Sequence, residues 1–292
     1  IQNMAFYGCD AITDLDLSKV GVVSDAAFAY CNGLVDVVIP ANTTLEASVF
    51  QSCTALERVT IYSQNIGDAA FAMCTSLESV VFAGDVKFIG VQAFYGNTML
   101  RDVRFLKTVY SIGSLAFADC PSLTEFTLPA GLEVLGSQPL LGTSVETVKV
   151  SKDARITTTE LAAFAADTVK AYEVEEGNKY FSSKDGVLFD KTGHTLVAFP
   201  AGVQTTDIYT VPEGVTAIGD NAFAGVTGVY AVDLNEVETI GDYAFFAFGG
   251  LMSDESGSSV SVFGQVVGDT VRTIRAYAFS KSYVMLLPVS TN

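Results

Sequence analysis

The sequence contains no tryptophan, a single histidine and few charged residues, and these shortages exclude several classes of protein. Its 16 basic residues face 33 acidic ones, for a formal net charge of -17. It therefore lacks the cationic surface with which nucleic-acid-binding proteins displace counterions. No apolar run approaches the roughly 18 residues of a membrane-spanning segment. The 20 phenylalanines and 12 tyrosines are too many for a disordered chain. We expect a folded, acidic protein with no nucleic-acid partner and no membrane-spanning segment.

The shortage of histidine also limits the chemistry that the chain can perform. His194, the only imidazole, follows a predicted hairpin turn, where exposure is the usual outcome. A Ser-His-Asp or Cys-His catalytic site would have to use this residue, and a zinc site with two histidines is excluded. Neither the phosphate-binding pattern GxxxxGKS/T nor the dinucleotide-binding pattern GxGxxG occurs. We predict that the chain is not an enzyme and binds neither a cofactor nor a metal ion.

What the sequence does contain is an internal repeat of 21 to 24 residues, with two longer intervals. In most copies a phenylalanine follows a small residue, and we count positions from this phenylalanine, called position 0. An aliphatic residue lies at −5, often followed by glycine, and apolar residues lie at +6, +9 and +11. Position 0 is occupied by Phe6, Phe28, Phe50, Phe71, Phe94, Phe117, Leu140, Phe164, Phe223, Phe245 and Phe279.

Each repeat has two halves with different apolar periods. The end from +8 to +11 alternates with period 2, which predicts a short strand with every second residue buried. The half around position 0 has apolar spacings of four, one and three, which suit one or two helical turns. Three residues before position 0 lies a residue type that often caps the start of a helix. These predicted N-caps are Asp25, Asp68, Ser114, Ser137, Asp220 and Asp242.

A strand and a helical turn in about 23 residues cannot bury both apolar faces alone, so successive copies must stack. The sequence therefore predicts one α/β solenoid over residues 1–292, of about eleven to twelve coils. A parallel β-sheet would form one face and short helical turns the other. Two segments interrupt the period: a hairpin-like insertion at 178–200 and a loop-rich insertion at 251–270 that includes Ser253 to Ser259. Insertions of this kind serve binding in some solenoids and are merely tolerated in others.

The segment from Ile112 to Pro129 reads I-G-x-x-A-F-x-x-C-x-x-L-x-x-F-x-L-P and resembles the BspA-type leucine-rich repeat. Residues 178–190 and 196–200 resemble an insertion that recurs in bacterial members. The resemblance implies a leucine-rich-repeat solenoid at a bacterial cell surface, in a family implicated in adhesion to host proteins or other cells. Because Ile1 already occupies position −5 of the first repeat, we expect the natural N-terminus to be trimmed. The extracellular or cell-surface localisation therefore depends on the resemblance alone.

The five cysteines share one position of the repeat, +3, where Asn97 replaces cysteine in one copy. A row of metal-binding or reactive thiols is one interpretation. The other is a small apolar side chain that closes the turn into the strand, stacked once per coil. We predict the second arrangement, with unbridged thiols that face the core. The residues are Cys9, Cys31, Cys53, Cys74 and Cys120.

The outward-facing strand positions, +8 and +10, are the best candidates for a binding site. A curved solenoid commonly uses its concave sheet face to bind a protein or a glycan. An ordinary solvated sheet face, or a structural spacer that displays another domain, is the alternative. The identity of the ligand stays open. In two repeats the strand comes one residue early, so the outward positions there are at +7 and +9, and Tyr62 lies just after its strand. The candidate residues are Asp14, Asp16, Asp36, Arg58, Tyr62, Asp102, Arg104, Glu125, Lys149 and Glu173.

Overall fold

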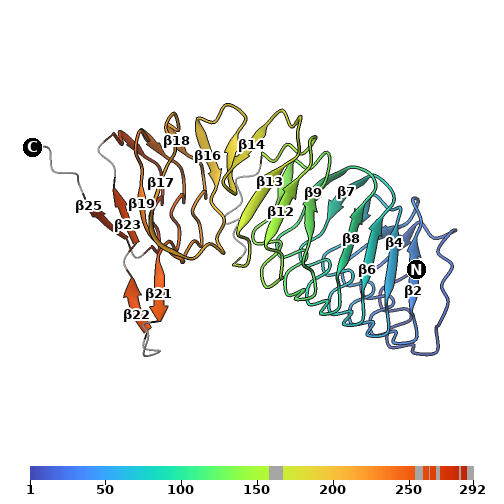
Figure 1. Cartoon of the computed structure of the whole chain (residues 1–292). Helices are drawn as coiled ribbons and strands as arrows, with labels where there is room; N and C mark the ends of the chain where they lie inside the picture. Colours follow the sequence, from blue (N-terminus) through green and yellow to red (C-terminus); the bar gives the residue numbers. More distant parts are fainter. Residues whose placement is uncertain (158–166, 254–258, 263, 268–269, 283, 288–292) are drawn as a thin grey trace, which may run out of the picture. The chain divides into compact units, whose positions relative to one another are not determined.

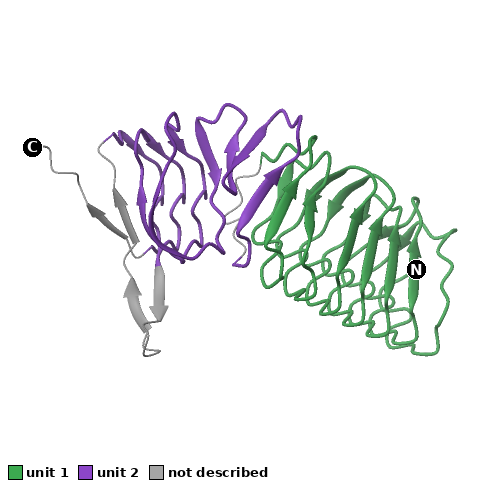
Figure 2. Ribbon diagram, in the orientation of Figure 1, with its two compact units in different colours: residues 1–163 green, residues 164–292 purple. Residues whose placement is uncertain are grey.

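The computed structural model describes residues 1–157, 167–253, 259–262, 264–267, 270–282 and 284–287. The chain divides into two compact units, residues 1–163 and 164–292, which are described separately below (Figure 2). The single continuous solenoid over residues 1–292 stays a prediction. Within the described residues, no helix is long and apolar enough to cross a membrane.

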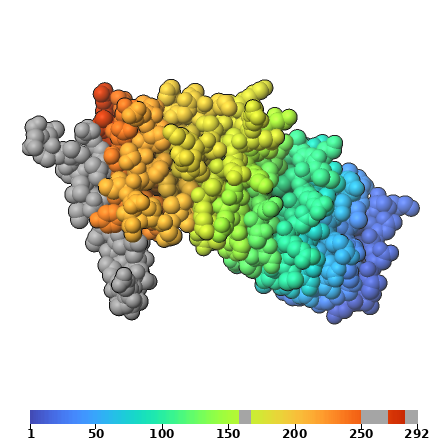
Figure 3. All heavy atoms as spheres, viewed as in Figure 1, coloured from blue at the N-terminus to red at the C-terminus, as the bar shows by residue number. Residues whose placement is uncertain are grey.

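Unit 1 is a stack of coils whose strands form two series, and each series is divided into separate parallel sheets (Figure 1). We call the first series the long strands and the second the short strands, because four of the six strands in the second have only two residues. The space-filling view shows the coils as successive bands of colour, because each coil lies against its sequence neighbours (Figure 3). The long strands are β2 (Asp36–Ile39), β4 (Arg58–Ile61), β6 (Ser79–Phe82), β8 (Asp102–Phe105), β10 (Phe126–Leu128) and β12 (Thr147–Val150). The short strands are β1 (Val22–Val23), β3 (Thr44–Leu45), β5 (Asn65–Ile66), β7 (Val86–Ile89), β9 (Val109–Ile112) and β11 (Val134–Leu135).

The long strands confirm the predicted period-2 pattern. Val59 on β4 lies opposite Val37 on β2 and Val80 on β6, so the +9 residues of successive coils are adjacent. All three side chains are buried, while their strand neighbours face solvent in full or in part. The short strands were not predicted: the aliphatic residue at −5, such as Ile66 or Ile89, ends a strand rather than beginning a helix.

A continuous stack of phenylalanine rings forms the core of unit 1. From Phe6 to Phe117, successive position-0 rings lie with centroids 5.1 to 5.5 Å apart and planes within 7° of parallel. The rings from Phe28 to Phe117 are fully buried. Offset-stacked aromatic pairs of this kind add to the free energy of burial.

The predicted helical turns are not confirmed, because the described residues contain no helix. The chain around position 0 forms a run of turns in which positions −2 and +2 adopt a left-handed backbone. Ala26 has φ of 53° and Tyr30 has φ of 60°. The same pair of left-handed positions recurs in each described coil whose position 0 was predicted, with glycine at +2 in four of them: Gly8, Gly96, Gly142 and Gly225.

Hydrogen bonding explains why turns replace a helix. Ala27 donates its N–H to Ser24 within the coil at 3.2 Å, whereas Phe28 donates to Val49 of the next coil at 2.9 Å. A helix would use both N–H groups within its own coil. The run of turns instead directs every second N–H to the neighbouring coil, which extends the ladder around the solenoid.

The predicted N-caps act between coils rather than on a helix. Asp25 accepts a hydrogen bond from the N–H of Ala47 at 2.9 Å, and Asp68 accepts one from Val91 at 2.8 Å. Donor and acceptor occupy position −3 of adjacent coils. Equivalent bonds join Ser114 to Ser137, Asp220 to Asp242 and Asp242 to Ala276.

Unit 2 contains the predicted hairpin, extended by one strand. β14 (Phe181–Lys184), β15 (Val187–Asp190) and β16 (Thr195–Ala198) form an antiparallel meander. β16 then pairs in parallel with β18 (Ala217–Ile218), which is followed in the same sheet by β20 (Thr239–Ile240) and β24 (Thr273–Ile274). The ring of Phe199 stacks on Phe223 at 5.0 Å. Phe199 therefore extends the phenylalanine stack of unit 2, which the sequence analysis missed.

The remaining strands of unit 2 are β13 (Ala171–Val174), β17 (Thr205–Thr210), β19 (Val229–Asp233), β21 (Gly250–Ser253), β22 (Ser259–Val262), β23 (Gly264–Val267) and β25 (Val284–Leu287). β21 and β22 pair antiparallel within the predicted 251–270 insertion. Residues 254–258, the centre of the predicted loop, and Phe164 lie outside the described residues. The expected count of eleven to twelve coils is not confirmed.

Candidate binding surface

The candidate site residues on β2, β4, β6 and β8 lie in two straight rows, which we call the outer sheet face. Register places the +8 residues side by side, because Asp36 lies opposite Arg58, Arg58 opposite Ser79, and Ser79 opposite Asp102. The +10 residues form a second row. This row consists of Val38, Thr60, Val81 and Arg104. The first row is polar throughout, whereas the second contains two valines, a hydroxyl and a guanidinium group.

Arg58 is held by carboxylates of its own sheet. Its Nε and Nη2 atoms donate to the two carboxylate oxygens of Asp36 at 2.5 and 2.7 Å, and Nη1 donates to Glu57 at 2.8 Å. The hydrogen bond and the charge of Asp36, more than Glu57, raise the pKa of the Arg58 guanidinium. The fork-shaped pair fixes both side chains in one geometry. Because both are more than half exposed, the pair adds little to stability.

Arg104 is paired in the same way, with Asp102 on the same strand. Its Nε and Nη2 atoms lie 2.9 and 2.6 Å from the two carboxylate oxygens of Asp102. Arg101 likewise donates to Glu78 at 2.5 Å. Lys149 is exposed on β12, and the described residues offer it no ion pair. The arginines that the sequence marked as candidate cationic contacts are therefore already matched by acidic neighbours.

The other predicted residues lie farther from these rows. Asp14 and Asp16 are exposed but precede the first strand. The N–H of Ser18 donates to Asp16 at 2.9 Å, and this hydrogen bond lowers the pKa of Asp16. Glu125 precedes β10, and Tyr62 follows β4 with 45% of its surface exposed. The last candidate, Glu173, is exposed on β13 in unit 2.

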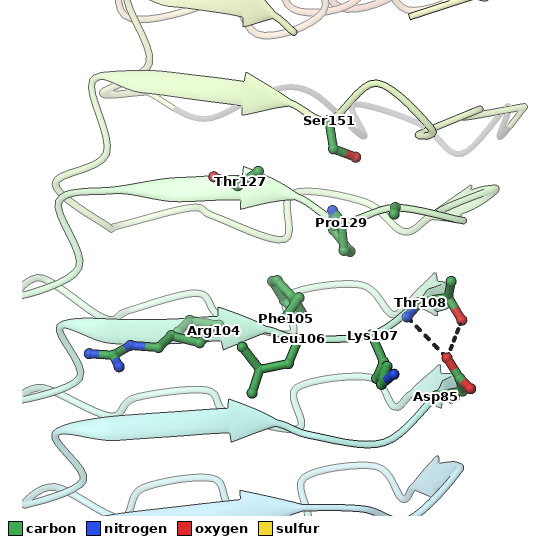
Figure 4. Close-up of a pocket in the computed structure, with 11 residues that line it drawn as sticks. Asp85, Arg104, Phe105, Leu106, Lys107, Thr108, Thr127, Pro129 and Ser151 are labelled. Atoms are coloured by element: carbon green, nitrogen blue, oxygen red, sulfur yellow. Dashed lines mark hydrogen bonds between the residues drawn. The ribbon is translucent and has the colours of Figure 1, made fainter.

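A cavity of about 600 Å³ opens between β8 and β10 (Figure 4). Its apolar lining includes Val103, Phe105 and Pro129, and Arg104 and Lys107 also contribute. In Figure 4, Phe105 and Pro129 lie between the ends of the two strands, while the guanidinium of Arg104 points away along β8. Among the candidate residues, the cavity includes Arg104 alone. Sequence reasoning missed the remainder.

The cavity lies where the long-strand sheet is interrupted. Within the described residues, β8 pairs with β6 and with no other strand, and β10 begins a separate sheet. In the coils of β4, β6 and β8, the residue at +12 donates its N–H to the +11 carbonyl of the preceding coil, as Leu106 does to Phe82 at 2.9 Å. Pro129 occupies +12 in the β10 coil and has no N–H to donate to Phe105. This proline was the one sequence signal for the interruption.

The lining of the cavity also includes Asp85 and Thr108, which are hydrogen-bonded to each other. Asp85 accepts hydrogen bonds from the hydroxyl and the N–H of Thr108 at 2.7 and 3.2 Å (Figure 4). These bonds, and to a smaller degree the charge of Lys107, lower the pKa of Asp85. The carboxylate is thus committed to joining two neighbouring coils.

The cysteine prediction is confirmed: all five thiols are free, and all but Cys9 are buried. Each buried thiol donates a hydrogen bond to the carbonyl at position 0 of the preceding coil. The Sγ of Cys53 lies 3.1 Å from the carbonyl of Phe28. Asn97 makes the same contact through Nδ2, 3.1 Å from Phe71. Burial raises the pKa of Cys53 to about 12, which keeps the thiol neutral. The row is structural, because each thiol joins two coils. It adds a second hydrogen bond to a carbonyl that already accepts one within its own turn, as Phe28 does from the N–H of Cys31 at 3.3 Å.

His194 lines a second, smaller hollow of about 300 Å³ in unit 2, together with Ser182, Lys184 and Glu213. Within the described residues, no group of three or more histidine, cysteine, aspartate and glutamate side chains is placed to hold a metal ion.

The model of the BspA-type leucine-rich repeat region matches residues 1–66, 64–189 and 198–267, in six copies. The chain belongs to this family. The BspA-type repeat thus accounts for the phenylalanine stack, the cysteine row and the strand of each coil. No curated protein matches the chain.

Two solved leucine-rich-repeat proteins share the fold. A leucine-rich repeat protein from Eubacterium ventriosum is 18% identical with a TM-score of 0.57, over 87% of this chain and 63% of that one. A leucine-rich repeat protein from Bacteroides ovatus has the same identity and score, over 96% and 73%. The pneumococcal vaccine antigen PcpA is 20% identical with a TM-score of 0.49, over 82% and 58%. This BspA-type chain therefore spans 63% and 58% of the lengths of the E. ventriosum protein and PcpA.

Proposed function

We propose that this chain is a non-enzymatic binding module of a bacterial cell surface, whose outer sheet face binds a host or microbial protein or a glycan. The observation that carries the proposal is the pair of adjacent rows on β2, β4, β6 and β8. The first row presents charged and hydroxyl groups, and the second presents apolar groups together with Thr60 and Arg104; Val38 in this row has 50% of its surface exposed. Membership of a family of surface proteins supports the extracellular location.

The ion pairs of the outer sheet face suit this role because they fix the orientation of the paired guanidinium and carboxylate groups. Asp36 and Arg58 form a fixed pair that offers both acceptors and donors to a ligand without further ordering. Each exposed polar contact contributes only about 0.2–1 kcal/mol and weakens with salt. Useful affinity therefore requires several coils to contact the partner at once.

The test is a binding screen against extracellular-matrix proteins and glycans, followed by charge reversal. A variant with Arg58, Arg104 and Lys149 changed to Glu should lose binding to the partner that the screen identifies. Its melting temperature should stay nearly unchanged, because the three side chains are exposed. The matched control reverses Lys19, Lys87 and Lys191, which are exposed elsewhere.

Equal binding by both reversal variants would place the site outside the outer sheet face. If the chain binds no member of the screen saturably, that result favours the alternative of a structural spacer that displays another domain.

A further inference from the structure

Among the residues that the structure describes, β8 has a strand partner on one side only. In a parallel ladder, alternate residues of a strand bond to neighbours on opposite sides. Leu106 donates its N–H to Phe82 of the preceding coil at 2.9 Å. Val103 and Phe105, at the alternate positions, therefore direct their N–H and C=O groups away from that coil. On that side β8 has no strand partner among the described residues.

The side chains around this open edge are apolar and partly uncovered. Val103 and Phe105 are half-buried, whereas the equivalent residues of the preceding coil, Val80 and Phe82, are fully buried. Leu106 has 62% of its surface exposed. The cavity volume of about 600 Å³ lies within the range of ligand sites in proteins, roughly 300–1,000 Å³. Open strand edges with apolar side chains are templates for another strand.

Charge does not select the occupant of the cavity. Asp102 matches Arg104 through two short contacts. Lys107 lies close enough to the carboxylate of Asp85 to influence its ionisation. The features that remain for recognition are the free backbone groups of β8 and the apolar lining. Both suit an extended peptide rather than a small anion.

We propose that the cavity receives an extended, apolar segment of a partner protein, which pairs with β8 as a fifth strand of the β2–β4–β6–β8 sheet. The inference rests on the proposed function, since the segment would belong to a protein held on the outer sheet face. A segment that matches the four residues of β8 would be about 13 Å long at the rise of an extended chain. Its alternate side chains would face Phe105 and Pro129, and its backbone would bond to Val103 and Phe105.

Amide hydrogen exchange tests the pairing directly. The probe is a blocked peptide of about six alternating valine and threonine residues with a solubilising lysine tail, at about 1 mM. In the free protein, the amides of Val103 and Phe105 should exchange faster than those of Val80 and Phe82. The peptide should slow exchange at Val103 and Phe105 at least tenfold and leave the other two unchanged. The same peptide with every second nitrogen methylated should give no protection, because it lacks the ladder donors.

Two matched variants test the position of the site. Leu106→Asp places a charge in the cavity and should weaken peptide binding at least tenfold. Met99→Asp makes the same change at a residue of unit 1 with 47% exposure that does not line the cavity, and it should bind the peptide normally. Equal protection by the methylated peptide, or unchanged binding by Leu106→Asp, would overturn strand addition.

Two further outcomes separate this inference from the proposed function. If the peptide protects neither amide while a screened partner still depends on Arg58, Arg104 and Lys149, strand addition fails and the binding face stands. If the amides become protected without peptide as the protein concentration rises, a second copy fills the cavity, and the assignment to a partner protein is wrong.

Discussion

Phe94 is the most informative position at which to test the stacked phenylalanine core. Its fully buried ring lies between Phe71 and Phe117, with centroids 5.3 and 5.2 Å away and planes within 6°. The edge of a third ring, Phe82, approaches it at 5.7 Å. Replacing a buried phenylalanine by alanine costs about 3–5 kcal/mol through lost burial and the cavity that remains. Because three aromatic contacts of about 0.5–1.5 kcal/mol each are also lost, we expect the upper half of that range for Phe94→Ala.

Phe88→Ala is the matched control, since it removes the same atoms from the same unit. Phe88 has 51% of its surface exposed and makes one edge-on contact, with Tyr110 at 6.2 Å. We expect Phe88→Ala to lower the free energy of unfolding by less than about 1 kcal/mol. Denaturant unfolding followed by circular dichroism measures both variants, as the chain has no tryptophan for fluorescence. Comparable losses at the two sites, or a loss below about 1 kcal/mol at Phe94, would refute the stacked-ring core.

Two other predictions concern the contacts between coils. A Cβ at Gly113 would lie 2.7 Å from backbone atoms of Gly90 and Val91, so Gly113→Ala should lower the free energy of unfolding by about 1–3 kcal/mol. Gly21→Ala, whose added Cβ would have no atom within 4 Å, should lower the free energy of unfolding much less. If Gly113→Ala costs as little as Gly21→Ala, the coils can move apart to admit the added carbon. For Cys53, burial raises the pKa from 9.0 to about 12, so its contribution is complete below pH 9 and is lost as the pH rises from 9 to 12. The thiol then ionises only in the unfolded chain, and Cys53→Ala should reduce the decline of stability with pH by up to about 1.4 kcal/mol per pH unit. An unchanged decline, measured by denaturant unfolding in reductant, would contradict the buried neutral thiol.

The positions that face the core could be predicted from the sequence because their signal is local and repeated. Most coils present a phenylalanine at position 0 and apolar residues at +9 and +11, so Phe94 and Val80 are assigned by the period alone. Likewise, the cysteine row follows from one shared position. Once copies stack, these residues have no other place to be buried.

The period of the sequence repeat does not predict the contacts between coils. The residues before position 0 suited a helix, and only the stacked structure shows that Phe28 donates to Val49 of the next coil instead. Similarly, Asp36 and Arg58 are 22 residues apart, and it is the strand register that makes them an ion pair. The sequence marked both as candidate ligand contacts without indicating that each matches the other.

The interruption of the sheet beside β8 likewise depends partly on the sequence and partly on the tertiary structure. The missing N–H of Pro129 is written in the sequence, as is that of Pro40, which holds the same +12 position after β2, the first strand of its sheet. The loss of one donor does not by itself set how far two coils stand apart, because neighbouring coils are joined by several other hydrogen bonds. The sequence determined which residues are buried, because burial repeats with the period. The tertiary structure decided where neighbouring coils bond or separate, because pairing depends on groups far apart in the chain.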